Sequence, residues 1–236
     1  MFDVRKTAII AFAAMSGVFL TSAANALPTL RLTQISPLIL PAAGPASVTI
    51  TDDGIGDGTP IPGSISFNGA VGNFDLNVAT GVTKPILGSA QDPLLDLNSI
   101  DINFSNPGTI VIEFSETDFT TGSSSLQFRS VIGGTTVGTL RFQTFGSNSN
   151  TLFDQGILIN DSGDISAGLV DFEEVSTAAL TGTFSLTTVV TITHTGAPDN
   201  TSFNSILEIP EPYIAPPLIL GTMLIGANLL ARRRRR

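Results

Sequence analysis

Acidic side chains are the groups in this sequence whose types and spacing could do chemistry. Asp52, Asp53 and Asp57 lie among glycines in TDDGIGDGT at 51–59, and carboxylates gathered in a flexible loop can hold calcium. The loop is not an EF-hand, because the third and twelfth positions counted from Asp53 are isoleucine and serine. The pattern leaves two interpretations open, weak calcium binding or an acidic turn without a metal.

Two further acidic groups could supply the paired carboxylates of a glycosidase. They are Glu116 with Asp118, and Asp171 with Glu173 and Glu174. The sequence contains no G-x-S-x-G elbow, H-E-x-x-H pair or phosphate-binding G-x-x-x-x-G-K-[ST] loop. We therefore expect no catalytic residues and no enzymatic activity, with an extracellular hydrolase as the less favoured alternative.

His194 is the single histidine, and cysteine is absent. Any histidine-based acid–base or metal chemistry must use His194, which belongs to the apolar face of a predicted strand, so a hydrogen-bonded structural role is the preferred interpretation. The lack of cysteine excludes disulfides, thiolate metal sites and a lipidated cysteine anchor.

Charge is distributed unevenly along the chain. The segment from Leu27 to Leu207 carries 17 acidic and 4 basic residues, a net charge of −13. Such a surface repels nucleic-acid phosphates and anionic lipid head groups, so we expect no nucleic-acid partner. It is compatible with divalent cations or with simple solubility outside the cell.

Residues 1–26 have the three parts of a secretory signal peptide. MFDVRK carries charge, TAIIAFAAMSGVFLT is largely apolar, and SAANA supplies small residues. Ala24 and Ala26 fit the positions that signal peptidase reads, which predicts export through the Sec translocon and cleavage after Ala26. A retained membrane helix is the alternative, but the apolar run of 15 residues is short for one.

The last residues predict a membrane anchor. Residues 213–231 carry no charge, and as a helix they would span about 28 Å, although Pro216-Pro217 break helix near the start and Asn228 is polar. Basic clusters stay on the cytoplasmic side. The chain ends in such a cluster: Arg232, Arg233, Arg234, Arg235 and Arg236. We expect an ectodomain outside, one transmembrane helix and a cytoplasmic stub, rather than a nucleic-acid-binding tail.

Pro210-Glu211-Pro212, an apolar span and a terminal arginine cluster follow one another in the last 27 residues. This arrangement resembles the C-terminal PEP-CTERM sorting signal of Gram-negative bacteria. The resemblance implies processing by exosortase, a membrane transpeptidase-like enzyme, with Pro210, Glu211 and Pro212 as the recognised motif. It also implies anchoring in the inner membrane with the ectodomain in the periplasm, then a cell-surface or extracellular location in bacteria that make exopolysaccharide.

The physical character of the motif agrees with that role. Pro210 and Pro212 lack amide donors and favour extended backbone, so the segment does not readily join a sheet or helix. Upstream, TKPILGSAQDPLLDLNSIDI, SETDF and LTTVVTITHTG are similar to segments of uncharacterised β-rich ectodomains with the same signal. That second resemblance implies no known activity.

The segment 27–207 alternates apolar and polar residues with the period of β-strands. In TFSLTTVVTITH one face should hold Phe184, Leu186, Val190, Ile192 and His194. The other should be an exposed threonine-rich ladder of Thr183, Ser185, Thr187, Thr191 and Thr193. Similar runs occur at 47–51, 64–68, 73–78, 99–105, 109–115, 126–133, 138–145, 155–160 and 202–209.

These runs predict an all-β domain. We expect an antiparallel β-sandwich, with a jelly roll as the alternative, and a hairpin from 99 to 115 turning at 106–108. The sorting segment then occupies 208–236.

The whole sequence favours an exported, non-enzymatic surface or biofilm-matrix protein without a cofactor. A polysaccharide- or calcium-binding module on the same route is the alternative. Sugar-binding sandwiches usually stack rings on Trp or Tyr, yet Trp is absent and the single tyrosine, Tyr213, lies in the sorting segment.

Overall fold

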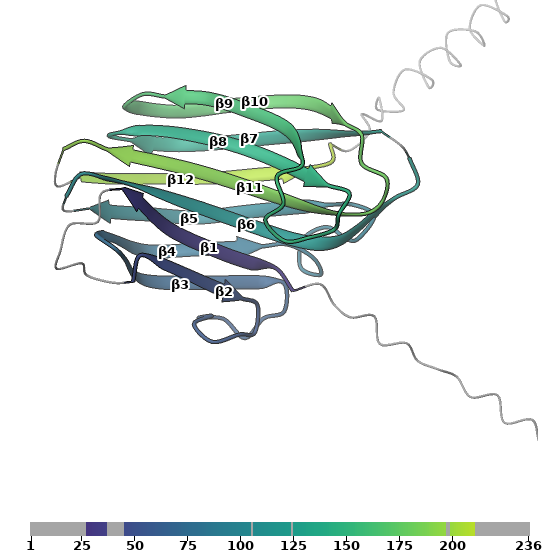
Figure 1. The fold of residues 1–236 in the computed structure, drawn as a ribbon, viewed down its shortest axis with the longest axis horizontal. Coiled ribbons are helices and arrows are strands. Elements are labelled where there is room, and N and C mark those ends of the chain that lie inside the picture. The colour runs from purple at the N-terminus through teal and green to yellow at the C-terminus, as the bar shows by residue number, and fades with distance from the viewer. Residues whose placement is uncertain (1–26, 37–44, 105, 124, 197–198, 211–236) are drawn as a thin grey trace, which may run out of the picture.

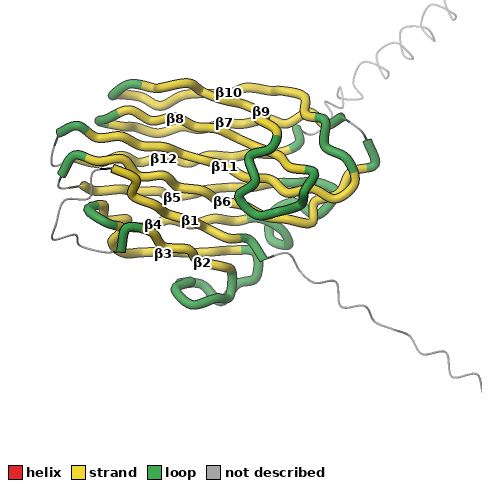
Figure 2. Tube along the Cα trace, viewed as in Figure 1, coloured by secondary structure: helices red, strands yellow, loops and turns green. Residues whose placement is uncertain are grey.

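The computed structural model describes residues 27–36, 45–104, 106–123, 125–196 and 199–210. These residues form two stacked antiparallel sheets, which confirms the all-β class and the β-sandwich architecture (Figures 1 and 2). The described residues contain no helix with the length and apolar character of a membrane span. The predicted signal peptide at 1–26 and the span at 213–231 lie outside the described residues.

Twelve strands are described. In chain order they are β1 (Thr29–Ser36), β2 (Ser47–Thr51), β3 (Ser64–Val71), β4 (Phe74–Val82), β5 (Leu94–Phe104), β6 (Gly108–Thr121), β7 (Leu126–Thr136), β8 (Thr139–Ser147), β9 (Ile157–Ile165), β10 (Gly168–Ala178), β11 (Gly182–His194) and β12 (Asp199–Glu208). Sheet A has the order β2-β1-β6-β11-β8-β9, and sheet B has the order β10-β7-β12-β5-β4-β3.

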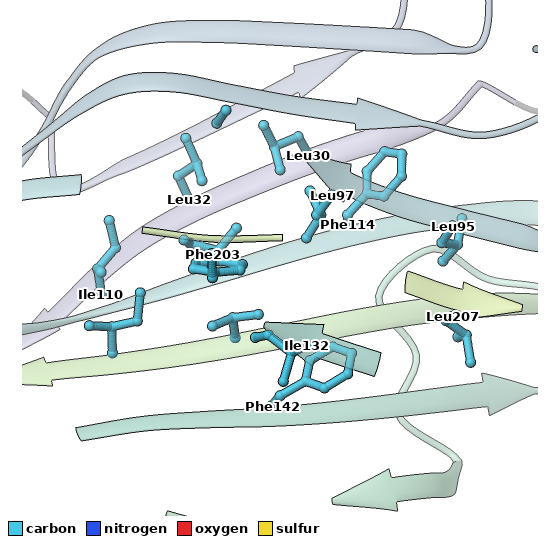
Figure 3. Close-up of a cluster of buried hydrophobic side chains, with 14 of the residues drawn as sticks. Leu30, Leu32, Leu95, Leu97, Ile110, Phe114, Ile132, Phe142, Phe203 and Leu207 are labelled. Atoms are coloured by element: carbon cyan, nitrogen blue, oxygen red, sulfur yellow. The ribbon is translucent and has the colours of Figure 1, made fainter. Parts of the chain in front are cut away.

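The core lies between the two sheets, where each strand turns its apolar alternate residues inward (Figure 3). Sheet A contributes Leu30, Leu32, Ile110, Phe114 and Phe142. Sheet B contributes Leu95, Leu97, Ile132, Phe203 and Leu207. Each such side chain contributes about 1.5–3 kcal/mol of hydrophobic free energy, and together they hold the sheets face to face.

Strand β11 confirms one half of its predicted pattern and corrects the other. The five residues from Phe184 to His194 assigned to the inner face are all buried. The exposed ladder is wrong in part, because Ser185 and Thr187 are also buried. The β8–β9 loop at 148–156 folds over the outer face of sheet A there, and Ser185 Oγ–H donates to Thr151 O at 2.8 Å.

The predicted hairpin at 99–115 is wrong. β5 pairs with β4 and β12 in sheet B, whereas β6 pairs with β1 and β11 in sheet A. Each strand has an apolar face, and the chain crosses between the sheets so that these faces meet through the core. Strands β1 and β10 were not predicted from their residues.

Both ends of the folded domain lie at the same end of the sandwich. Figure 1 shows β1 beginning and β12 ending on that side. The register agrees, because Thr29 of β1 pairs with Ser115 and Glu208 of β12 pairs with Leu94, where β5 begins. We call this the loop end, since the β2–β3, β4–β5 and β8–β9 loops also lie there.

Candidate functional site

The acidic loop after β2 turns two of its carboxylates toward its own backbone. Asp52 is buried, and its Oδ2 accepts the Gly63 N–H at 2.6 Å. Asp57 accepts three backbone N–H groups, at 3.1, 3.1 and 2.9 Å. Burial raises the pKa of Asp52. In these hydrogen bonds the carboxylates accept from backbone N–H groups that have no backbone acceptor in the loop. Such bonds stabilise the conformation of an acidic turn.

Asp53 and Asp57 also line a surface hollow of about 250 Å³ beside Gly54 and Gly58. Within the described ranges, no group of three or more His, Cys, Asp or Glu side chains is arranged to hold a metal ion. Asp52 does not line the hollow that Asp53 and Asp57 share. Calcium binding at this loop stays a prediction.

Glu116 and Asp118 make separate contacts in the structure. Glu116 is fully buried. Asp118 and Asn150 both have left-handed backbone, with φ of 61° and 52°. Two hydrogen bonds join these residues: the Asn150 side-chain Nδ2–H donates to Asp118 Oδ1 at 2.6 Å, and the Asp118 backbone N–H donates to Asn150 Oδ1 at 2.8 Å. This pair fixes the β8–β9 loop to strand β6.

The second acidic group lies along β10 at the edge of sheet B. Asp171, Glu173 and Glu174 are exposed, and Glu173 Oε1 accepts the Arg129 Nε–H at 2.7 Å. That bond lowers the pKa of Glu173. Charged residues on an edge strand discourage pairing with another chain, which accounts for these three without a catalytic role.

His194 ends strand β11 inside the core. Its ring stacks on Phe104 with centroids 3.5 Å apart and planes 14° from parallel. Its Nε2 lies 3.2 Å from Thr201 Oγ1 on β12. These contacts join the two sheets at the end opposite the loop end, as expected of a structural histidine.

A buried pair at the loop end was not singled out from the sequence. Lys84 follows β4 in sheet B, and its Nζ lies 2.8 Å from Oε1 of Glu116 on β6 in sheet A. Thr83 Oγ1 lies 2.5 Å from Glu116 Oε2. Burial lowers the pKa of the Lys84 amine and raises the pKa of the Glu116 carboxyl. The two residues are 32 positions apart in the chain, so no local sequence pattern predicts their contact.

The open part of the outer face of sheet A is polar. A hollow of about 370 Å³ is lined by Thr139, Arg141, Gln143, Asp164, Thr191 and Thr193. Arg141 donates two hydrogen bonds to Asp161, at 2.9 and 2.5 Å, and Gln143 donates a third at 3.0 Å. The Arg141 bonds lower the pKa of Asp161 to about 2. Fixed donors and acceptors on the face of a sheet can bind a hydroxyl-rich ligand.

The β8–β9 loop closes the other part of that face. Phe153 N–H donates to Ser115 Oγ at 3.0 Å, and the Arg31 guanidinium lies 4.0 Å from the centre of the Phe153 ring. Arg31 is itself held by two hydrogen bonds to Glu113, at 2.5 and 2.7 Å. These contacts hold the β8–β9 loop in place on the outer face of sheet A, next to the polar hollow.

The processing residues lie mostly beyond the described part of the chain. The fold ends where Ile209 N–H donates to Pro93 O at 3.3 Å, and Pro210 follows. Outside the described residues lie Ala24, Ala26, Glu211, Pro212 and the arginines from Arg232 to Arg236.

Comparison with known proteins adds little. No family model and no curated protein matches the sequence. One solved structure, an isomalto-dextranase from Arthrobacter globiformis T6 complexed with panose, is 12% identical and overlaps 76% of this chain and 32% of its own, with a TM-score of 0.22. The chain thus spans about a third of that protein. So low a TM-score carries no argument about fold or function.

Proposed function

We propose that this is an exported, non-enzymatic surface or extracellular-matrix protein of a Gram-negative bacterium. It is anchored in the inner membrane through 213–231 and processed by exosortase near Pro210–Pro212. The observation that carries the proposal is the fit between the fold and the two flanking signals. The sandwich begins at Thr29 and ends at Glu208, between the cleavage predicted after Ala26 and the proline-flanked glutamate.

The arrangement of the terminal strands supports the same proposal. β1 lies between β2 and β6, and β12 lies between β7 and β5. Both are interior strands with partners on each side, so the sheets do not depend on an added strand from either flanking segment. A domain of this kind keeps its fold when both flanking segments are removed.

Intact mass spectrometry of the protein from surface and membrane fractions of its host tests the proposal. We expect a chain that begins at Leu27 and ends near the motif. Glu211→Ala should fold normally and remain unprocessed, whereas the matched control Glu208→Ala, just upstream in β12, should be processed normally. A wild-type mass that retains Arg236, or normal processing of Glu211→Ala, would overturn the assignment.

The polar hollow on sheet A favours a second candidate function, binding of exopolysaccharide. Arg141 and Gln143 present fixed donors there, beside the hydroxyls of Thr191 and Thr193. Co-sedimentation with the host polysaccharide should weaken in Gln143→Ala. Co-sedimentation should be unchanged in Arg129→Ala, because Arg129 belongs to sheet B. Equal retention of both variants would exclude this face as the binding surface.

A further inference from the structure

The Lys84–Glu116 pair is shielded from solvent at the junction of the two sheets. Glu116 and Thr83 are fully buried, and only 15% of the Lys84 side chain is exposed. The Lys84 Nζ lies 3.9 Å from the centre of the buried Phe119 ring. A dry site of this kind destabilises charge on both groups, because neither can be hydrated.

The hydrogen bonds around Thr83 indicate that Glu116 carries a proton. Thr83 Oγ1 lies 2.7 Å from the Leu94 carbonyl oxygen and 2.5 Å from Glu116 Oε2. A hydroxyl has one hydrogen, and a carbonyl oxygen has none to give. Both contacts are satisfied when Glu116 Oε2–H donates to Thr83 Oγ1 and the Thr83 hydroxyl donates to Leu94.

The amine is held against this acid. Lys84 Nζ–H donates to Thr117 O at 2.6 Å. The same nitrogen lies 2.8 Å from Glu116 Oε1. Burial favours the neutral amine as it favours the neutral acid. An amine whose charge burial destabilises and a carboxyl group that carries its proton are thus fixed at contact distance, the arrangement that condensation needs.

We propose that Lys84 and Glu116 condense to an intramolecular amide that joins the β4–β5 loop of sheet B to strand β6 of sheet A. The Nζ lone pair forms a bond to Cδ of Glu116, and the bond from Cδ to Oε2 breaks. Oε2 leaves as water with its own hydrogen and one hydrogen from the amine, so no oxidant or other reactant is needed. Thr83, hydrogen-bonded to Oε2, is placed to pass a proton to the leaving oxygen.

The cross-link would connect the neighbours of both terminal strands. Ser115, adjacent to Glu116, pairs with Thr29 of β1. The β4–β5 loop leads into Leu94, which pairs with Glu208 of β12. A chain without cysteine would gain a covalent tie between its sheets at the end where it enters and leaves the fold. This inference is independent of the proposed export and processing.

Mass spectrometry of the denatured full-length protein tests the proposal. We expect a mass lower than the sequence requires by one water molecule. Cleavage before aspartate places Lys84 in peptide 75–91 and Glu116 in peptide 101–117. The cross-linked protein should release these two peptides as one branched ion that fragments from both.

Two controls separate the cross-link from other losses of water. Asp53-Gly54 and Asp57-Gly58 could lose water as succinimides, but that change stays in other peptides and reverses in mild base, whereas the amide persists. Lys84→Arg should restore the full mass. Glu116→Gln should yield the same branched ion by loss of ammonia. Separate, unmodified peptides from the folded wild-type protein would overturn the proposal and leave the pair as two unlinked side chains.

Discussion

Acid unfolding should report directly on the Asp161 carboxylate of sheet A. Its pKa is lowered from 3.8 to about 2, mainly by the hydrogen bonds from Arg141. A carboxyl group whose pKa is lower in the folded state than in the unfolded state stabilises the fold at pH values above the unfolded pKa. For Asp161 that stability is lost as pH falls from 3.8 through about 2. The full shift would correspond to about 2.4 kcal/mol. The Arg141 side chain is 45% exposed, so solvent screening reduces the expected contribution to about 1 kcal/mol.

Urea unfolding across the acidic range measures this contribution. Asp161→Asn should be less stable than wild type by about 1 kcal/mol at neutral pH, and the two curves should converge at the acid end. Asp164→Asn, an acid lining the same hollow, serves as the matched control and should keep the wild-type slope. A stability difference between wild type and Asp161→Asn that does not change with pH would refute the reasoning.

Further predictions concern the loops and the core. Ser115→Ala removes the acceptor of the Phe153 N–H and should cost about 1–2 kcal/mol, with faster amide exchange across 148–156; unchanged exchange would mean that other contacts hold the loop. Gly81→Ala places a Cβ 2.6 Å from the Phe114 ring and should cost about 1–3 kcal/mol in thermal unfolding; an unchanged midpoint would contradict that close approach. His194→Leu keeps an apolar group against Phe104 but loses the contact with Thr201 and should cost about 1 kcal/mol in thermal unfolding; an unchanged midpoint would contradict the structural role of His194. Calcium binding at 51–59 requires the thermal midpoint to rise in millimolar calcium, and a constant midpoint would remove it.

Strands with strict alternation could be predicted from the sequence, because period-2 patterns follow from strand geometry alone. The alternation predicts β2 with its observed bounds, and the structure confirms the predicted inner face of β11. The two missed strands depart from the pattern. β1 buries Gln34, whose Oε1 accepts the Asn73 N–H at 2.6 Å. β10 lies at a sheet edge and carries Asp171, Glu173 and Glu174. These acidic residues interrupt the alternation of apolar and polar residues that would predict a strand.

Long-range relations could not be predicted. An apolar face shows that a strand packs against a core, but not which strand pairs with it, so the 99–115 hairpin failed when β5 and β6 entered different sheets. The burial of Ser185 depends on a loop that lies 34 residues away in the chain. The Lys84–Glu116 pair is equally non-local. The acidic loop was located correctly, but the inward turn of Asp52 depends on Gly63 across the β2–β3 loop.

The shared position of the chain ends has a consequence for what the molecule presents to its surroundings. If the domain is anchored as proposed, through the residues after Pro210, its loop end is held toward the membrane. The acidic β2–β3 loop and the β8–β9 loop would then lie close to the lipid surface. The β3–β4, β7–β8 and β9–β10 turns at the opposite end then face outward. Release from the anchor would uncover the loop end, so an antibody against 51–59 should label the released protein and be occluded on the anchored one.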